Sequence, residues 1–173
     1  WDLGDAAHYS QQQHETDLAS FAWRGLPGSR IRLYFEVYEA LWSIPHTARL
    51  PLVADILHWA SVTAAQLSQA RPMTADELRQ MAACPLVTIG GHTVNHLPLD
   101  ELAAAEQQAE ISGCQSSLEA LLGRPVESFA YPHGKLNDDT LRILDQCGFT
   151  LACSTRQTST AAGDNPFLLP RVV

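Results

Sequence analysis

The sequence predicts an α/β fold in which parallel strands alternate with helices. From Thr74 onward, segments with helical periodicity alternate with short apolar runs that are typical of buried strands. Capping residues and glycines mark where the helices begin and end. Alternation of this kind implies parallel strands joined by right-handed crossovers. Polar residues that directly follow such strands meet on one face of the fold, where active sites are commonly built.

The composition is that of a globular protein. Of 173 residues, 46% are apolar and 17% are charged, which excludes a disordered or fibrous chain and suits one domain with a sizeable core. Lys and Arg number 11 against 19 Asp and Glu, a formal net charge of -8, and the basic residues form no cluster, so nucleic-acid binding is not expected. No apolar run has the length of a transmembrane segment, and none is expected. The oligomeric state is left open.

The cysteines predict free thiols. Cys84, Cys114, Cys147 and Cys153 contain no Cys-x-x-Cys pair, and each lies in an apolar or helical stretch. Free thiols favour a reducing, cytoplasmic compartment.

We expect residues 1–73 to be a lead-in and a helical segment. Residues 1–29 predict irregular or short strand structure, and apolar residues at helical spacing predict a helix over 30–44 that ends at Pro45. A second helix is expected from His46 or Pro51 to about Gln69. The residues expected to face inward are Leu52, Ile56, Trp59 and Leu67, and Trp23 and Trp42 are also assigned to the core. His8, His14, His46 and His58 show no ligand spacing and are expected at the surface or in packing.

Residues 74–173 supply the alternating elements. Thr74 and Glu77 form a capping box that opens a helix to about Ala83. A strand is expected over 86–89, and Gly90-Gly91 forms the turn that ends it. A long helix follows, which begins at Asp100 and ends at Gly123. The remaining expected elements are a strand over 126–131, a helix from Asp138 or Asp139 to Cys147, and strands over 149–154 and 168–173.

A histidine pair is the strongest candidate site. His92 and His96 follow the strand predicted over 86–89, four residues apart. With one helical turn between them, two imidazoles can present their ring nitrogens to a single ion, for which zinc is well suited. Many helices carry two such histidines for no functional reason, but the place directly behind an apolar strand favours metal binding.

A second candidate follows the strand over 126–131. Pro132 fixes the backbone and Gly134 permits an unusual turn at the end of Phe129-Ala130-Tyr131-Pro132-His133-Gly134. The segment is either a plain strand terminus or a loop that aims a backbone N–H at an oxyanion.

These motifs carry a resemblance to a known family. Residues 92–96 (His-Thr-Val-Asn-His) are similar to the His-Ser/Thr-x-x-His motif of the polysaccharide deacetylase family, the NodB-homology or carbohydrate esterase family 4 domain. Residues 129–134 resemble its next motif, Arg-x-Pro-Tyr-Gly or, in one branch, Phe-Ala-Tyr-Pro-Tyr-Gly. The helix between them, the stretch over 147–155 and the closing Leu-Pro-Arg also match, so that the resemblance covers 74–173. Residues 1–70 resemble a helical insertion found in one branch.

The resemblance implies a distorted (β/α) barrel, incomplete in this chain, and a hydrolase that removes N-acetyl groups from a polysaccharide or glycan precursor. In that family two His and one Asp hold one divalent ion, which we expect to be Zn2+. Carried onto this sequence, His92 and His96 become metal ligands and the backbone N–H of His133 the oxyanion donor. Thr93 orients the loop, and Tyr131, Pro132 and Gly134 shape the turn against the carbohydrate substrate. Family members often act at the cell envelope.

Departures from the family pattern matter equally. The first family motif, Thr-Phe-Asp-Asp, supplies the base and the third ligand and is absent, so we expect it before Trp1 and expect this chain alone to be inactive. Ala130 stands where an Arg commonly braces the catalytic Asp, and His133 replaces the usual Tyr and is the one stand-in for an unassigned general acid. Asp100 and Asp164 could replace the missing carboxylate, although a helix start favours capping for Asp100.

Three alternatives remain open. The chain could be a non-catalytic carbohydrate-binding or assembly module, which Ala130 and the unassigned acid favour. It could instead hydrolyse non-peptide C–N bonds in a small molecule. Finally, the histidines could hold a structural ion, which four protein ligands would coordinate.

Overall fold

The computed structural model describes residues 10–19, 29–42, 44–63 and 71–171. The chain divides into two compact units, Trp1–Ala70 and Arg71–Val173, and each is described by itself. Within the described segments, no helix combines the length and the apolar character that crossing a bilayer requires.

The described residues of the first unit form the helices α1 (Gln11–Ala19), α2 (Arg30–Trp42) and α3 (His46–Trp59). The prediction of irregular or strand structure is wrong for α1. Ser10 and Gln13 cap this helix reciprocally, since the Gln13 N–H donates to Ser10 Oγ (3.2 Å) and the Ser10 N–H donates to Gln13 Oε1 (2.8 Å). The helix predicted over 30–44 is confirmed as α2.

Helix α3 ends about ten residues before the predicted boundary, because Ala60 and Ser61 turn out of the helix and Ser61 has a φ of 52°. Its predicted inward face is also wrong. Trp59 is 69% exposed and Leu52 37%, because the apolar residues of α3 are spread around the helix instead of forming one stripe. Ile56 and Trp42 are half-buried and His58 is exposed. Outside the described residues lie His8, Trp23, Leu67 and Gln69, together with the side chains of His14 and His46.

The second unit begins with α4 (Ala75–Ala82), and the predicted capping box is confirmed. The Glu77 N–H donates to Thr74 Oγ1 at 3.3 Å, and the Thr74 N–H donates to Glu77 Oε2 at 2.7 Å. Arg71 also pairs with this carboxylate at 2.7 Å. The guanidinium of Arg71, together with the Thr74 hydrogen bonds, lowers the pKa of Glu77 to about 2.

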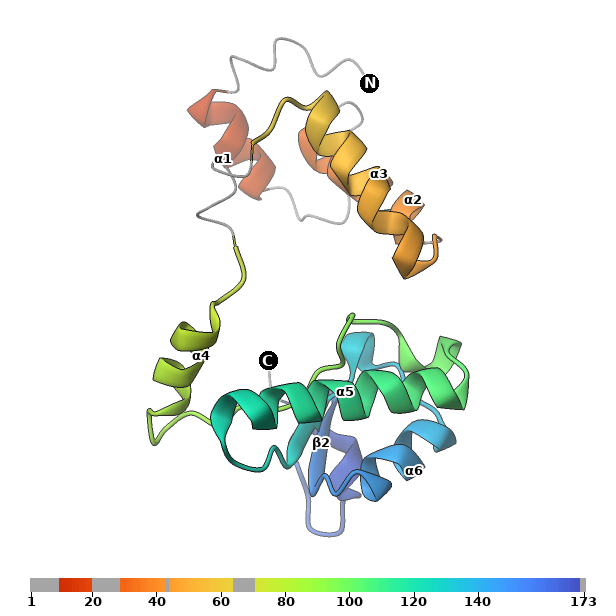
Figure 1. Ribbon diagram of the computed structural model, residues 1–173. Coiled ribbons are helices and arrows are strands. Elements are labelled where there is room, and N and C mark those ends of the chain that lie inside the picture. The colour runs from red at the N-terminus through yellow and green to blue at the C-terminus, as the bar shows by residue number, and fades with distance from the viewer. Residues whose placement is uncertain (1–9, 20–28, 43, 64–70, 172–173) are drawn as a thin grey trace. The chain divides into compact units, whose positions relative to one another are not determined.

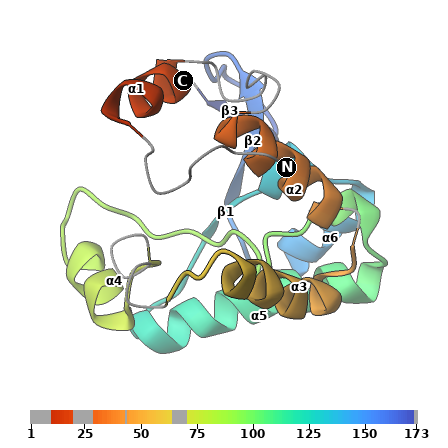
Figure 2. The same cartoon turned by 90° about the horizontal axis from the view of Figure 1, so that it is seen from above.

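Three short parallel strands form the sheet, in the order β1 (Ser128–Ala130), β2 (Leu151–Gln157) and β3 (Leu169–Arg171). The prediction of parallel strands is confirmed (Figure 2). The strand predicted over 86–89 is wrong: Val87 N–H donates back to the Cys84 carbonyl at 3.0 Å in a turn, and Leu86 is 92% exposed. The ladder position beside β1 is taken by Gly91, whose N–H donates to Ser128 and whose carbonyl accepts from Ala130.

Helices are confirmed where two were predicted after Asp100 and after Asp138 or Asp139, but the residues at their N-termini differ from the prediction. Asp100 lies in a short 3₁₀ turn, η4 (Leu99–Glu101), and forms an ion pair with Lys135 (3.6 Å), so its predicted capping role is wrong. Helix α5 (Ala104–Leu122) begins after Ala103, whose N–H the Glu106 carboxylate accepts, and it ends at Gly123 as predicted. The cap of α6 (Asp138–Gln146) is Asn137, one residue before the predicted aspartates.

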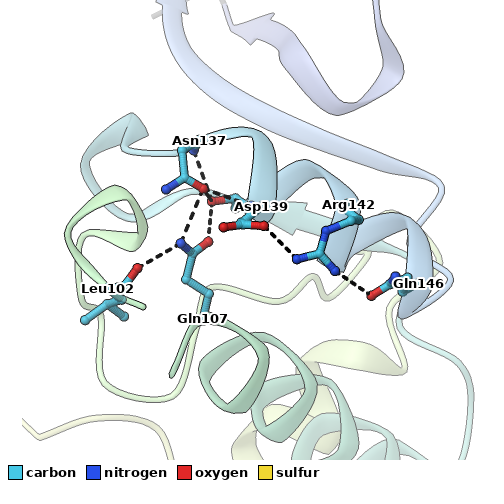
Figure 3. Close-up of polar contacts among 7 residues, drawn as sticks. Leu102, Gln107, Asn137, Asp139, Arg142 and Gln146 are labelled. Carbon is cyan, nitrogen blue, oxygen red and sulfur yellow. Dashed lines mark hydrogen bonds and ion pairs between the residues drawn. The ribbon is translucent and has the colours of Figure 1, made fainter. Parts of the chain in front are cut away.

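Apolar side chains from the sheet and both helices form one core. Its fully buried members include Ile111 of α5, Ile143 and Leu144 of α6, and Phe129 and Ala152 of the sheet. Helices α5 and α6 lie side by side (Figure 1). A polar contact joins them, since buried Gln107 accepts the Thr140 hydroxyl at 2.6 Å and reaches Asn137 and the Leu102 carbonyl (Figure 3). This core fixes α5 against the sheet, where two polar loops begin.

Candidate active site

The loop His92–His96, which we call the histidine loop, follows the Gly91 bridge directly. The two imidazole rings are brought together, with centroids 4.8 Å apart, and both residues are exposed. The predicted helical turn between them is wrong. Thr93 and His96 instead adopt left-handed backbone conformations with φ of 63° and 57°, which cost non-glycine residues about 1 kcal/mol or more each and therefore need outside support.

One ring of the pair is oriented by the neighbouring strand. Nδ1 of His92 lies 2.7 Å from the Ala130 carbonyl oxygen. A carbonyl only accepts, so Nδ1 must carry the proton and donate. This tautomer leaves the Nε2 lone pair for an ion, which is how metal-binding histidines are usually fixed. Ala130, which departs from the family pattern in its side chain, therefore contributes through its backbone.

The backbone of His96 is held by Thr93, which is 8% exposed. Thr93 Oγ1 accepts the backbone N–H of His96 at 2.9 Å. Partial loss of hydration lowers the pKa of His96 below its ordinary value of 6.5, and the charges of His92 and His133 lower that pKa further. A lowered pKa keeps the ring neutral, the form that binds metal.

Helix α5 holds the histidine loop through two residues that were not predicted. The buried Glu110 carboxylate accepts the backbone N–H groups of Val94 (2.9 Å) and Asn95 (2.8 Å) and the side-chain amide of Asn95 (2.6 Å). One turn further on, the sulfur of Cys114 accepts the His92 N–H at 3.4 Å. Burial raises the pKa of the Cys114 thiol. The sequence feature that could have indicated this role is a glutamate, Glu110, on the same side of the predicted helix as Ile111 and Cys114.

The segment Tyr131–Gly134, which we call the proline turn, follows β1 and contains the 3₁₀ turn η5 (Pro132–Gly134). His133 and Gly134 have φ of 56° and 69°, and the Gly134 N–H donates to the Tyr131 carbonyl at 3.0 Å. Tyr131 and Pro132 are buried. The Tyr131 hydroxyl donates to the Phe167 carbonyl at 2.7 Å, and burial raises the pKa of this hydroxyl.

The two loops meet at their histidines, because the rings of His96 and His133 lie with centroids 4.7 Å apart. A surface hollow continues from the proline turn and is lined by Gly134, Ser154, Thr155, Arg156 and Leu168. The predicted site residues therefore lie in two loops, one directly after Gly91 and one directly after β1, and Gly91 and β1 are neighbours in the sheet.

Neither substitute carboxylate joins the histidines. Asp100 pairs with Lys135, and Asp164 accepts the Ala161 N–H (2.8 Å) within its own loop. Across the described ranges, no group of three or more His, Cys, Asp or Glu side chains is arranged to hold a metal ion. The predicted free cysteines are confirmed. The described residues thus bring two imidazoles side by side, and the Ala130 carbonyl orients the ring of His92.

The chain belongs to the polysaccharide deacetylase family, which matches residues 45–152. This is a family of hydrolytic enzymes that act on carbohydrates and generally depend on a metal. Among curated proteins, the chain is 32% identical over 109 residues to a chitooligosaccharide deacetylase of Azorhizobium caulinodans, a match covering 60% of this chain and 50% of that protein. It is 24% identical over 100 residues to YxkH of Bacillus subtilis, covering 58% of this chain and 36% of YxkH.

The fold agrees with solved deacetylases. The Streptococcus pyogenes deacetylase PplD, solved in complex with acetate, superposes with a TM-score of 0.57 at 25% identity, covering 62% of this chain and 47% of PplD. The chain thus spans half or less of the length of these relatives.

Proposed function

We propose that this chain is the histidine-bearing part of a metal-dependent hydrolase that removes N-acetyl groups from a polysaccharide or glycan precursor. Family membership supports the reaction class. The observation that carries the proposal is the imidazole pair His92 and His96, with one tautomer fixed by the Ala130 carbonyl. Two exposed imidazoles beside a strand end, one of them oriented, fit the donor set of a divalent ion, and imidazole favours zinc among common metals.

In this proposal His92 and His96 supply two of the metal ligands. The bound ion would polarise the acetamide carbonyl and activate water. The chain's own residues bind and orient around that reaction. Thr93 holds the backbone of His96, and the proline turn presents the His133 N–H toward the developing oxyanion. Tyr131, Pro132 and Gly134 shape that turn against the substrate.

We also propose that the third ligand and the general base come from residues outside this sequence. The two carboxylates considered as substitutes are engaged elsewhere. The unit Arg71–Val173 would then be part of a distorted (β/α) barrel of the deacetylase type, with the helices of residues 1–73 as an insertion. The parallel order β1-β2-β3, with Gly91 in the next ladder position, supports this arrangement.

Deacetylation of chito-oligosaccharides, followed by mass spectrometry, tests the function. We expect the longer protein that contains this sequence to release acetate in a zinc-dependent manner, and this chain alone to release almost none. Turnover by this chain alone would show that the base has been misplaced. Zinc uptake without deacetylation by the longer protein would favour a non-catalytic carbohydrate-binding module.

A further inference from the structure

The histidine loop has a backbone that its own residues do not favour. Left-handed conformations at Thr93 and His96 flank Val94 and Asn95, and neither flanking residue is glycine. Such conformations persist only where the surroundings impose them. The two ring positions depend on these backbone angles, so whatever imposes the angles also sets the distance between the metal-binding nitrogens.

Glu110 makes hydrogen bonds that hold the loop in this backbone conformation. Both oxygens of its carboxylate are engaged: Oε2 accepts the consecutive N–H groups of Val94 and Asn95, and Oε1 accepts the Asn95 side-chain amide. The bonded residues are those between the two left-handed positions. Hydrogen bonds to an ionised acceptor are about twice as strong as neutral ones, and the side chain of Glu110 is only 7% exposed.

The part of α5 that carries Glu110 is packed into the core. Glu110 lies on α5, next to Ile111, which is fully buried in the core. Gly113 lets the loop approach the helix, since a Cβ at that position would lie 3.2 Å from Val94 Cγ2. Cys114 accepts the N–H of His92 from the same face. Helix α5 thus holds the loop through three of the loop's backbone N–H groups, those of His92, Val94 and Asn95.

We propose that Glu110 is a positioning residue for the metal: its buried carboxylate fixes the histidine loop so that His92 and His96 face a common point before any ion arrives. This inference rests on the proposed function for the identity of the ligand. Glu110 acts through the loop, because the hydrogen bonds that its two oxygens make are with N–H donors of Val94 and Asn95. Preorganisation of this kind improves affinity because the ordering cost is met during folding.

The test uses Glu110→Ala and Glu110→Gln, with Glu119→Gln as matched control. Glu119 lies on the same helix and also accepts a backbone N–H, that of Val126 at 3.0 Å, away from the histidine loop. Two quantities are measured: hydrogen exchange of the Val94 and Asn95 amides in the metal-free chain, and the zinc dissociation constant from an NMR titration of the imidazole signals. The metal-free readout tests the loop independently of the proposed function.

We expect Glu110→Ala to raise both amide exchange rates about tenfold or more and to weaken zinc binding about 10- to 100-fold, the usual effect of removing an orienting partner. Glu110→Gln keeps one acceptor and should fall between wild type and Ala, whereas Glu119→Gln should match wild type. Unchanged exchange and zinc affinity in Glu110→Ala would overturn the proposal. If that variant does not fold, wild-type values in Glu110→Gln would overturn it instead. If zinc binding by this chain is too weak to measure, the exchange rates decide the role of Glu110, and a zinc titration of the longer protein that contains this sequence decides the proposed function.

Discussion

The histidine loop and the proline turn occupy equivalent places, each directly after a ladder position of the sheet, but they are held in different ways. The histidine loop is exposed and is fixed by hydrogen bonds from buried polar groups, chiefly Glu110 and Thr93. The proline turn is fixed by buried side chains, Tyr131 and Pro132, and by close packing of Gly134 against Thr155. Both contain non-glycine residues at positive φ.

This difference suits what each loop would present in the proposed function. A metal ligand needs a side chain at the surface with a defined direction, so its support comes from the backbone beneath it. A backbone N–H donor needs the main chain itself placed, and buried side chains on either side can do that. The comparison predicts that polar substitutions disturb metal binding, while packing substitutions disturb stability.

Removing a ligand should have the largest effect. His96→Ala deletes one of two imidazoles, and we expect zinc affinity to fall by at least about 100-fold, more than the loss of an orienting partner. Calorimetry measures this effect. His58→Ala, on the exposed side of α3, should leave the affinity unchanged. Equal affinity in His96→Ala and wild type would remove His96 from the site.

A methyl group in the proline turn should cost stability and not metal affinity. In Gly134→Ala the new Cβ would collide with the side chain of Thr155 at a φ of +69°. We expect a loss of about 3 kcal/mol in the free energy of unfolding, from the overpacking and the left-handed backbone together. Gly123→Ala is the control, since its φ is +65° with no atom within 4 Å of the added Cβ, and it should lose only about 1 kcal/mol. Equal losses in urea denaturation would rule out the close contact.

Tyr131→Phe should have a smaller effect of the same kind. It removes the hydroxyl that donates to the Phe167 carbonyl at 2.7 Å and leaves that acceptor without its phenol partner. A loss of about 1–2 kcal/mol is expected from urea denaturation. The imidazole signals of His92 should not move. A shift of those signals would mean that the two loops are not supported separately.

The smallest expected effect concerns pH. Burial lowers the pKa of His96 below its ordinary value of 6.5, and the charges of His92 and then His133 lower that pKa further. Protons compete with zinc, so a lowered pKa moves the loss of zinc binding to lower pH. His133→Gln removes that charge and should raise the pKa of His96 toward 6.5, so that zinc binding is lost at higher pH. NMR titration of the ring measures this, and a pKa that stays the same or falls would contradict the contact.

The sequence predicted the parallel α/β arrangement because capping boxes and glycines mark its helices. The capping box at Thr74 and the end of α5 at Gly123 are local signals, and the structure confirms both. The strand predicted over 86–89 is wrong. Its apolar residues are typical of a buried strand, but the residue that pairs with β1 is Gly91. Helix α1 was missed because its cap is a serine paired with glutamine within a polar segment.

For the site, motif spacing brought out His92 and His96 but not what holds them. Glu110 is separated from the histidine loop by the start of α5, and its role appears only when that helix packs under the loop. The tautomer of His92 depends on a carbonyl 38 residues away. Neither contact leaves a local pattern in the sequence. By contrast, Pro132 and Gly134 predicted the proline turn because Pro fixes its own φ and Gly permits a left-handed backbone.

The central claim is that two imidazoles converge on one ion, with His92 binding through Nε2. A zinc titration of this chain, followed by the nitrogen signals of His92 and His96, tests it most directly. We expect the Nε2 signal of His92 and one ring-nitrogen signal of His96 to shift together at the same zinc concentration, while the Nδ1 proton of His92 stays bonded to the Ala130 carbonyl. Shifts of one ring alone, or coordination of His92 through Nδ1, would contradict it.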